Sequence, residues 1–261
     1  MSTRGRIAQP PRRVTVAVVV ACLVAVGAAF ALNQTRATEP TTTISNPVDP
    51  AKLTARPGNV VLPDDPRMLI LGDSYTLGTA ASPDYGYANI VARRLGWPAE
   101  VDGIGGTGFT WGGGSEGADG NTYRARIERR AGGFAPNVLL LQGGQNDYRA
   151  TPDEVRAAVT ETIDTARRVW PGVQILVMGP SQPMPGGALL RRVSDPIGQA
   201  AVTADAGFIS PLDENWFTDQ NSPGFYGDAN GAHPNTAGHE YIADRVLERF
   251  RRLGASVSDA A

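Results

Sequence analysis

The chain contains only one cysteine and two histidines among its 261 residues. The cysteine, Cys22, lies inside an N-terminal apolar run, so no thiol remains to stabilise a folded domain through disulfides. No cluster of histidine, cysteine and acidic residues has the spacing of metal ligands. We therefore expect a domain that works without a metal or another cofactor.

An excess of charge of one sign is missing as well. The 24 basic and 26 acidic residues leave a formal net charge of −2. Without a basic stripe, the folded part lacks the electrostatic features that nucleic-acid binding requires. Hydrophobic residues make up 41% of the chain, and 31 glycines and 20 prolines accompany them, so the composition is that of a globular domain with many loops.

The N-terminus differs from the rest of the chain. Four arginines, the last of them Arg13, precede an uncharged apolar run over residues 14–32. This order is typical of a secretory signal peptide or of an N-terminal membrane anchor with its basic end in the cytoplasm. A small-x-small sequence at residues 29–31 favours cleavage, whereas the length of the run also suits a membrane span. In either case the protein should be extracytoplasmic, either secreted or bound to the membrane through segment 1–32.

The remaining chain divides into three parts. Residues 33–66 are rich in Thr, Pro, Asn and Asp and predict an extended linker, residues 67–254 predict one domain, and residues 255–261 predict a disordered tail. Within the domain, buried strands are expected at residues 68–71, 137–141 and 174–178, and helices at residues 87–95, 152–170 and 236–253. This alternation predicts the α/β class, as a three-layer α/β/α sandwich around a mostly parallel sheet.

The first expected strand ends in Gly72, Asp73 and Ser74. Ligands of such sheets bind at the carboxyl ends of the strands, so a serine at this exit is well placed to act as a nucleophile. An ordinary turn or helix cap at the Asp-Ser pair is the alternative.

Two further side chains complete a candidate site. Asn146 follows the strand at residues 137–141, where its amide could donate to a developing oxyanion, while Asp147 more simply caps a turn or braces the loop. A plain Gly-Asn-Asp turn is the alternative for this segment. A general base of the commonest kind must be His233 or His239. His233 lies in a loop before the last helix, and His239 lies within that helix as a partly exposed residue, so His233 is the preferred base.

Four blocks in this order resemble the SGNH (GDSL-like) hydrolase family over about residues 67–253: Gly72-Asp73-Ser74, the glycine-rich segment at 103–108, Gly144-Gln145-Asn146-Asp147 and His233-Pro234. The resemblance implies a flavodoxin-like sheet and a serine esterase. It further implies that Ser74 is the nucleophile and that the oxyanion hole is formed by Ser74, Gly106 and Asn146. Gly105 is one position from the best match and remains an alternative to Gly106.

The sequence departs from the family at one position. Members usually carry Asp three residues before the histidine, and this chain has Asn230 there. Replacing that Asp by Asn in a serine protease lowers the rate about 10⁴-fold. Asn230 could still orient His233, Asp228 could take the role through a bent loop, or a backbone carbonyl could leave a Ser-His dyad.

Two glycine-rich motifs suggest other activities. Residues 103–108 also match the dinucleotide-binding pattern, but no helix start follows them. Residues 113–117 match the α/β-hydrolase elbow around Ser115, but no buried strand precedes it. Aromatic residues in loops near the site could form a rim for a sugar or an acyl chain: Trp111, Trp216, Phe217, Phe225 and Tyr226.

The predicted function is therefore an exported serine esterase that hydrolyses carboxylic esters of a small molecule, an acylated carbohydrate or a lipid through an acyl-enzyme on Ser74. An acyltransferase with the same acyl-enzyme is one alternative. A non-catalytic surface-binding domain on the same scaffold is another, motivated by Asn230.

Overall fold

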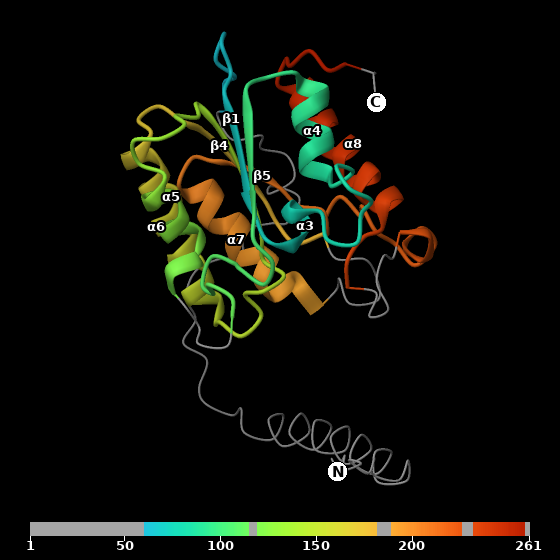
Figure 1. Cartoon of the computed structure of the whole chain (residues 1–261). Coiled ribbons are helices and arrows are strands. Elements are labelled where there is room, and N and C mark those ends of the chain that lie inside the picture. Colours follow the sequence, from blue (N-terminus) through green and yellow to red (C-terminus); the bar gives the residue numbers. More distant parts are fainter. Residues whose placement is uncertain (1–59, 115–118, 182–188, 226–231, 259–261) are drawn as a thin grey trace, which may run out of the picture. The chain divides into compact units, whose positions relative to one another are not determined.

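The computed structural model describes residues 60–114, 119–181, 189–225 and 232–258. Within these residues, five parallel strands form one sheet in the order β2-β1-β3-β4-β5 (Figure 1). The strands are β1 Met68–Gly72, β2 Ala99–Gly103, β3 Val138–Gln142, β4 Gln174–Met178 and β5 Gly207–Ile209.

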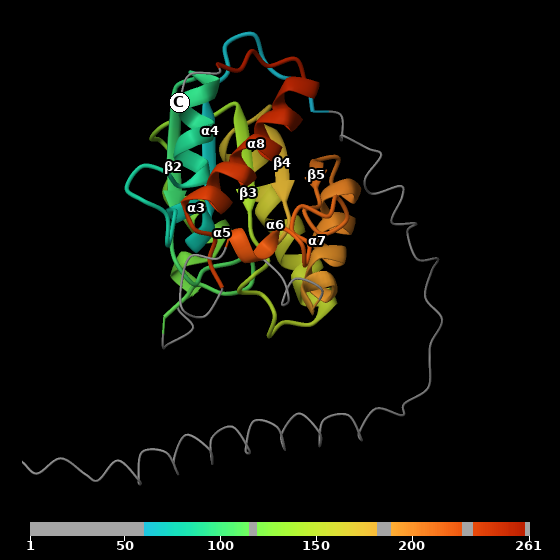
Figure 2. The same cartoon turned by 90° about the vertical axis from the view of Figure 1, so that its right-hand side faces the viewer.

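Helices cover both faces of the sheet (Figure 2). On one face lie α4 Tyr87–Leu95 and α8 Thr236–Arg252, and on the other lie α5 Tyr123–Arg129, α6 Pro152–Val169 and α7 Arg191–Thr203. Three short elements complete the described part: α3 Ser74–Leu77, η1 Asp119–Asn121 and η3 Ser222–Gly224. The predicted three-layer α/β/α sandwich is confirmed.

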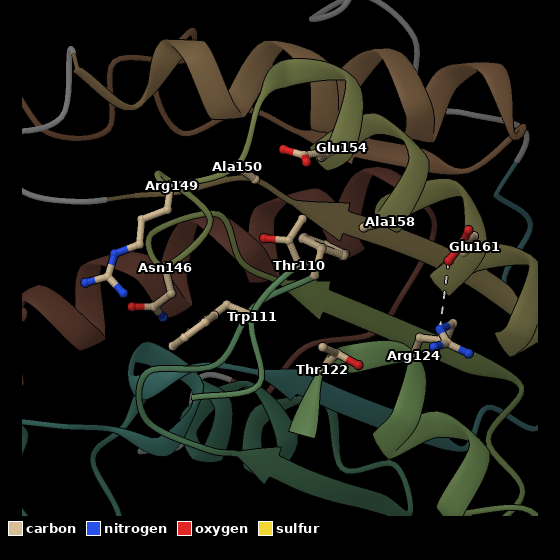
Figure 3. Close-up of a pocket in the computed structure, with 11 residues that line it drawn as sticks. Thr110, Trp111, Thr122, Arg124, Asn146, Arg149, Ala150, Glu154, Ala158 and Glu161 are labelled. Atoms are coloured by element: carbon tan, nitrogen blue, oxygen red, sulfur yellow. Dashed lines mark ion pairs between the residues drawn. The ribbon is translucent and has the colours of Figure 1, made fainter. Parts of the chain in front are cut away.

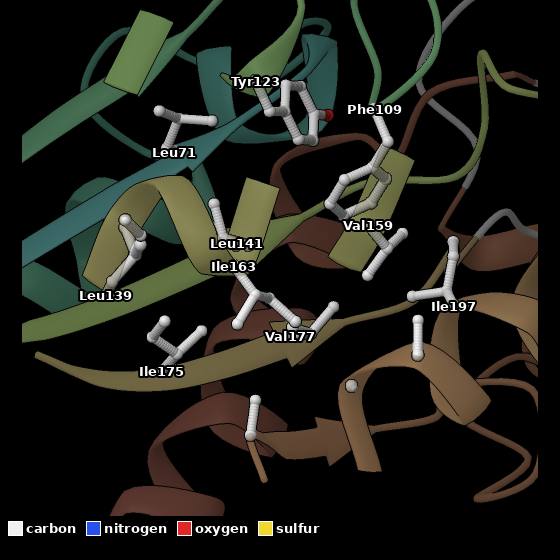
Figure 4. Close-up of a cluster of buried hydrophobic side chains, with 14 of the residues drawn as sticks. Leu71, Phe109, Tyr123, Leu139, Leu141, Val159, Ile163, Ile175, Val177 and Ile197 are labelled. Carbon is white, nitrogen blue, oxygen red and sulfur yellow. The ribbon is translucent and has the colours of Figure 1, made fainter. Parts of the chain in front are cut away.

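Alternation along β1 explains the two cores. Leu69 and Leu71 point into the layer of α5, α6 and α7, whose buried cluster is drawn in Figure 4. Met68 and Ile70 point into the layer of α4 and α8, because successive side chains of a strand face opposite sides. All four are fully buried, and each contributes about 2 kcal/mol relative to an exposed position.

The predicted strands and helices are present with shifts of one residue at some ends. α6 begins with a capping box, in which Thr151 and Glu154 each accept a backbone hydrogen bond from the other, and it ends at Val169. α8 begins after Asn235, whose side chain accepts from the amide of Gly238. His233 therefore lies just before a firmly capped helix.

Several elements were not predicted, among them α5, α7 and β5. α7 contains Pro196 in its interior, which is usually a helix breaker, and α5 spans only seven residues. β5 is three residues long and begins with Gly207. These segments acquire their structure from packing against the sheet, because their local sequence does not favour it.

The ordered domain extends beyond the predicted limits of 67 and 254. Val60 and Leu62 of the expected linker pack against the α4/α8 core, and the amide of Val61 donates to Gln174 Oε1 at 3.0 Å. At the other end, the amide of Ser258 donates to the Arg94 carbonyl at 2.8 Å. Residues 60–66 and 255–258 thus belong to the domain, because apolar side chains and backbone hydrogen bonds hold them to it.

Segment 1–32 lies outside the described residues. Among the helices that the structure does describe, none has the length and apolar character needed to cross a membrane.

Candidate active site

The structure brings Ser74 and His233 together at the carboxyl edge of the sheet. Ser74 opens α3 directly after β1, and His233 precedes α8. His233 Nε2 lies 2.9 Å from Ser74 Oγ, and both side chains are partly exposed. This hydrogen bond joins two residues that are far apart in the sequence, in the geometry that a general base and its nucleophile require.

The turn at Ser74 is tightly built. Asp73 caps α3 by accepting a hydrogen bond from the amide of Tyr75 at 2.9 Å. A side chain at position 72 would collide with Thr76 and Gln142, so Gly72 is required by packing. The amide of Ser74 belongs to the first turn of a helix and therefore has no acceptor within that helix.

Tyr75 links the Ser74 turn to the loop that carries His233. Its hydroxyl donates to the carbonyl oxygen of Ala232 at 2.8 Å, and its ring lies 5.8 Å from the His233 ring. The sequence analysis did not identify Tyr75, because in the sequence an aromatic residue beside a serine looks like an ordinary core residue. Its hydrogen-bond partner also lies 157 positions away.

Asn146 faces the glycine-rich loop after β2. Its Nδ2 donates to the carbonyl oxygen of Thr107 at 2.8 Å. Within that loop, a methyl group added to Gly105 would lie 3.9 Å from Ser74 Cβ, and Gly106 has φ +75°, a conformation that favours glycine. The loop thus approaches both Ser74 and Asn146, and both alternatives for the glycine remain beside the site.

Asp147 holds a different loop, at residues 109–110, which follows the glycine-rich segment. Its buried carboxylate accepts hydrogen bonds from the amide and hydroxyl of Thr110, at 2.7 and 2.6 Å, and from the amide of Phe109 at 3.3 Å. Burial raises the pKa of Asp147, and these hydrogen bonds oppose the rise.

A chain of hydrogen bonds runs from Tyr87 through Thr76 and Gln142 to the carboxylate of Asp73. Thr76 donates its one hydroxyl proton to Gln142 Oε1 at 2.8 Å, so the hydroxyl of Tyr87, also at 2.8 Å, must donate to Thr76. Gln142 Nε2 in turn donates to Asp73 at 3.2 Å and to Gln145 at 3.0 Å. Burial raises the pKa of Asp73 to about 7, against the effect of its hydrogen bonds with Tyr75 and Gln142.

Arg126 of α5 ties the exits of β1 and β2 together. Its buried guanidinium donates to the Gly72 carbonyl at 2.9 Å, to Thr107 Oγ1 at 3.1 Å and to Asp102 Oδ1 at 2.6 Å. Hydrogen bonds and charge from Arg126 and Arg130 lower the pKa of Asp102, although its partial burial opposes this. Sequence analysis missed Arg126 as well, since nothing local distinguishes it from the exposed arginines of α5.

His239 is structural, but the expectation of a partly exposed residue was wrong. It is fully buried, its Nδ1 accepts from the amide of Tyr87 at 3.2 Å, and its Nε2 donates to the Thr79 carbonyl at 3.1 Å. Burial lowers its pKa and keeps the ring neutral. Both nitrogens are therefore occupied, and His239 is unavailable as a base.

The proposed aromatic rim is only partly formed. Trp216 is fully buried and donates to Glu214, so it belongs to the core. Phe217 and Phe225 pack with Tyr241 of α8, with ring centroids 5.7 Å apart for the two phenylalanines. Trp111 lines a cleft beside Asn146. Asp228, Asn230, Ser115 and Tyr226 lie outside the described residues.

Comparison with known proteins identifies the family. The model of the GDSL-like lipase/acylhydrolase family matches residues 70–241. The chain belongs to this family. The GDSL hydrolase is 33% identical over 190 residues to the GDSL lipase Rv0518 of Mycobacterium tuberculosis, a match that covers 68% of this chain and 78% of that protein.

Solved structures share the fold of this GDSL hydrolase. A family two carbohydrate esterase from Clostridium thermocellum, in complex with cellohexaose, has a TM-score of 0.56 at 21% identity, over 76% of this chain and 66% of its own. Est24, a carbohydrate acetylesterase from Sinorhizobium meliloti, has a TM-score of 0.57 at 16% identity, over 72% of this chain and 99% of its own. With the family match, the protein is a carboxylic ester hydrolase.

Among the described residues, no group of histidine, cysteine and acidic side chains could hold a metal ion. The Ser74-His233 pair needs none for acyl transfer, because the imidazole itself can take up the serine proton.

Proposed function

We propose that this GDSL hydrolase is an exported serine esterase in which Ser74 is the nucleophile and His233 is the general base. The observation that carries the proposal is the 2.9 Å hydrogen bond between His233 Nε2 and Ser74 Oγ. For Nε2 to accept the serine proton, His233 must carry its own proton on Nδ1. The group that holds this Nδ1 proton would be Asn230, Asp228 or a backbone carbonyl.

The reaction follows from this pair. His233 takes the Ser74 proton as Oγ attacks the ester carbonyl, and the carbonyl oxygen becomes an oxyanion. The amides of Ser74 and Gly106 and the side chain of Asn146 would donate to it. His233 then passes the proton to the departing alcohol, and a water molecule releases the acid from the acyl-enzyme by the same steps in reverse order.

We further propose that the substrate is an acylated carbohydrate at or beyond the cell surface. The basic and apolar N-terminal segment supports the location. Carbohydrate esterases among proteins of the same fold, and polar residues in the cleft beside Asn146, support a sugar as the alcohol. A lipid ester is the competing substrate, since the related protein Rv0518 is named a lipase.

The first experiment compares hydrolysis of p-nitrophenyl acetate by the wild-type protein and by Ser74→Ala and Ser115→Ala. We expect Ser74→Ala to lose about 10⁴-fold or more in kcat/KM, as removal of a catalytic serine does elsewhere. Ser115→Ala is the matched control and should keep full activity. A fluorophosphonate should label the wild-type protein and the control, but not Ser74→Ala.

Loss of activity in Ser115→Ala alone would show that the nucleophile is Ser115 of the motif at residues 113–117, and not Ser74. Acetyl transfer to an added sugar, in excess over free acetate, would replace hydrolysis by acyl transfer. Activity that rises steeply from acetyl to long-chain esters would favour the lipid substrate.

A further inference from the structure

A cleft of about 520 Å³ adjoins the candidate site beside Asn146 (Figure 3). Its walls come from three places: the loop with Thr110 and Trp111, the turn with Asn146 and Arg149, and the facing sides of α5 and α6. Asn146 belongs both to this cleft and to the proposed oxyanion hole. A substrate whose ester lies at Ser74 could therefore extend one of its parts past Asn146 into the cleft.

The loop that forms one wall is held in place. Asp147 fixes Thr110 through its amide and hydroxyl, and the amide of Gly108 donates to the Trp111 carbonyl at 2.7 Å. The cleft is therefore preorganised, which lowers the entropy lost on binding.

The charged side chains that line the cleft differ in whether they form ion pairs or hydrogen bonds within the protein. Arg124 pairs with Glu161 at 3.9 Å and with Glu128 at 3.2 Å. Glu154 accepts hydrogen bonds from the amide and hydroxyl of Thr151 in the cap of α6. Each of these groups has a partner within the protein.

Arg149 differs from them. Its guanidinium carbon lies 5.6 Å from the ring centre of Trp111 and 5.3 Å from that of Tyr148. Within the described part of the chain, Arg149 has no hydrogen bond or ion pair, and it is exposed. Two aromatic contacts thus restrict the guanidinium while its five N–H donors stay available, an arrangement suited to bidentate binding of an oxyanion.

We infer that this cleft binds the sugar part of an anionic saccharide ester, with Arg149 holding a carboxylate or phosphate group of that sugar. The inference rests on the proposed function and names the substrate class more closely. Thr110 Oγ1, whose proton goes to Asp147, and Asn146 Oδ1 would accept hydrogen bonds from hydroxyl groups of the neutral part of the sugar ring.

The test uses three acetylated substrates: a methyl glucoside, a methyl glucuronoside and a methyl glucoside 6-phosphate. Acetate release is measured with the wild type, Arg149→Gln, Arg149→Lys and Arg252→Gln. Arg252 is exposed near the far end of α8, and among the described residues it pairs only with Glu248 on its own helix, so it controls for loss of a positive charge.

For the wild type we expect kcat/KM to be about tenfold or more higher for at least one anionic ester than for the neutral one, the usual effect of a charge-assisted hydrogen bond. Arg149→Gln should abolish this preference by lowering kcat/KM for the anionic ester to about its value for the neutral ester. Arg149→Lys should keep part of this preference, because lysine retains the positive charge but not the planar guanidinium that binds an anion through two hydrogen bonds. Arg252→Gln should behave as wild type. The glucuronoside and the phosphate distinguish the two anions.

Binding to Ser74→Ala, followed by calorimetry, tests the cleft separately from catalysis. The acetylated glucuronoside or the phosphate should bind about tenfold more weakly when Arg149→Gln is added. No anionic preference, or a preference that survives Arg149→Gln, would overturn the inference while Ser74-dependent hydrolysis of p-nitrophenyl acetate still supports the proposed function. Arg149-dependent binding without hydrolysis of any ester would overturn the proposed function and leave the cleft assignment standing.

Discussion

The exits of β1 and β3 each carry a buried aspartate next to a polar side chain of the candidate site, and the two aspartates have different partners. Asp73 precedes Ser74, and Asp147 follows Asn146. Asp73 accepts hydrogen bonds from Tyr75 in its own turn and from Gln142 on the neighbouring strand. Asp147 instead accepts three hydrogen bonds from residues 109–110, which belong to another loop.

The difference shows how the same residue can stabilise a site in two ways. Asp73 holds the local shape of the turn around Ser74, whereas Asp147 ties Asn146 to a distant loop. With fewer donors, Asp73 is the carboxyl whose pKa burial raises to about 7. The β1 exit should therefore respond more to pH, and the β3 exit more to loss of hydrogen bonds.

The largest effect is expected where the β1 exit meets the loop after β2. Arg126→Met removes the hydrogen bonds to Gly72 and Thr107 and leaves Asp102 without its main partner. We expect the free energy of unfolding in urea to fall by about 3–5 kcal/mol. Arg124→Met, on the exposed side of the same helix, should cost no more than about 1 kcal/mol. Equal losses of unfolding free energy in the two variants would show that the buried hydrogen bonds of Arg126 do not stabilise the fold.

Removing each aspartate tests the comparison directly. Asp147→Ala leaves three donors without an acceptor and should lower the free energy of unfolding by about 3 kcal/mol, whereas Asp73→Ala leaves two and should cost about 2 kcal/mol. The measurement is chemical denaturation at pH 5. The reverse order of the two variants would contradict the difference in support.

The pH dependence distinguishes the exits further. In the unfolded chain Asp73 ionises near pH 4, but in the folded protein it keeps its proton to about pH 7. The unfolded state thus binds fewer protons between these values, and Asp73 lowers stability progressively as pH rises from about 4 to 7. Relative to Asp73→Asn, the wild type should lose about 2 kcal/mol of unfolding free energy across this pH window. This is less than the full pKa shift of Asp73 implies, because the surroundings of a buried group relax when it ionises.

Denaturation of both proteins at pH 4.5, 6 and 7.5 measures this slope. His239 is shared by the two proteins, so its contribution cancels in the difference. A constant difference between wild type and Asp73→Asn would show that Asp73 is ionised throughout.

The smallest effect on stability should come from Tyr75→Phe. Loss of the hydroxyl removes its hydrogen bond to the Ala232 carbonyl and should cost about 1 kcal/mol. Because this hydrogen bond holds the loop of His233, kcat should fall about tenfold with little change in KM, as misplacement of a catalytic group does. Tyr85→Phe, at an exposed ring, is the control and should change neither. An unchanged kcat in Tyr75→Phe would limit this tyrosine to packing.

The sequence was sufficient to predict the parts of the molecule with strong local patterns. Apolar runs predicted β1, β3 and β4, helical spacing predicted α4, α6 and α8, and the short motifs predicted that Ser74 and His233 would meet. Chain composition suggested a linker and tail without structure, yet Val60 and Ser258 are held by the domain. Weak local preference is overcome there by contacts with residues distant in the sequence.

The supporting residues could not be predicted for the same reason. Nothing near Arg126 in the sequence distinguishes it from Arg124, and only the fold buries one and exposes the other. Trp216 could equally have been a rim residue or a core residue until its burial was known. Candidate catalytic residues can be recognised by their sequence motifs. The residues that hold them in place have no motif, because their partners become neighbours only in the folded structure.

The buried His239 gives this protein an acid limit that is independent of the proposed catalytic pair Ser74 and His233. Its pKa is below the usual 6.5 because burial disfavours the charged ring, so as pH falls below that value the unfolded chain takes up the proton first and the fold loses stability. A protonated ring could no longer accept from the amide of Tyr87, and α8 would lose a connection to α4. Acid inactivation would then reflect opening of this helix pair, and tolerance of acidic surroundings could be changed at His239 without altering Ser74 or His233.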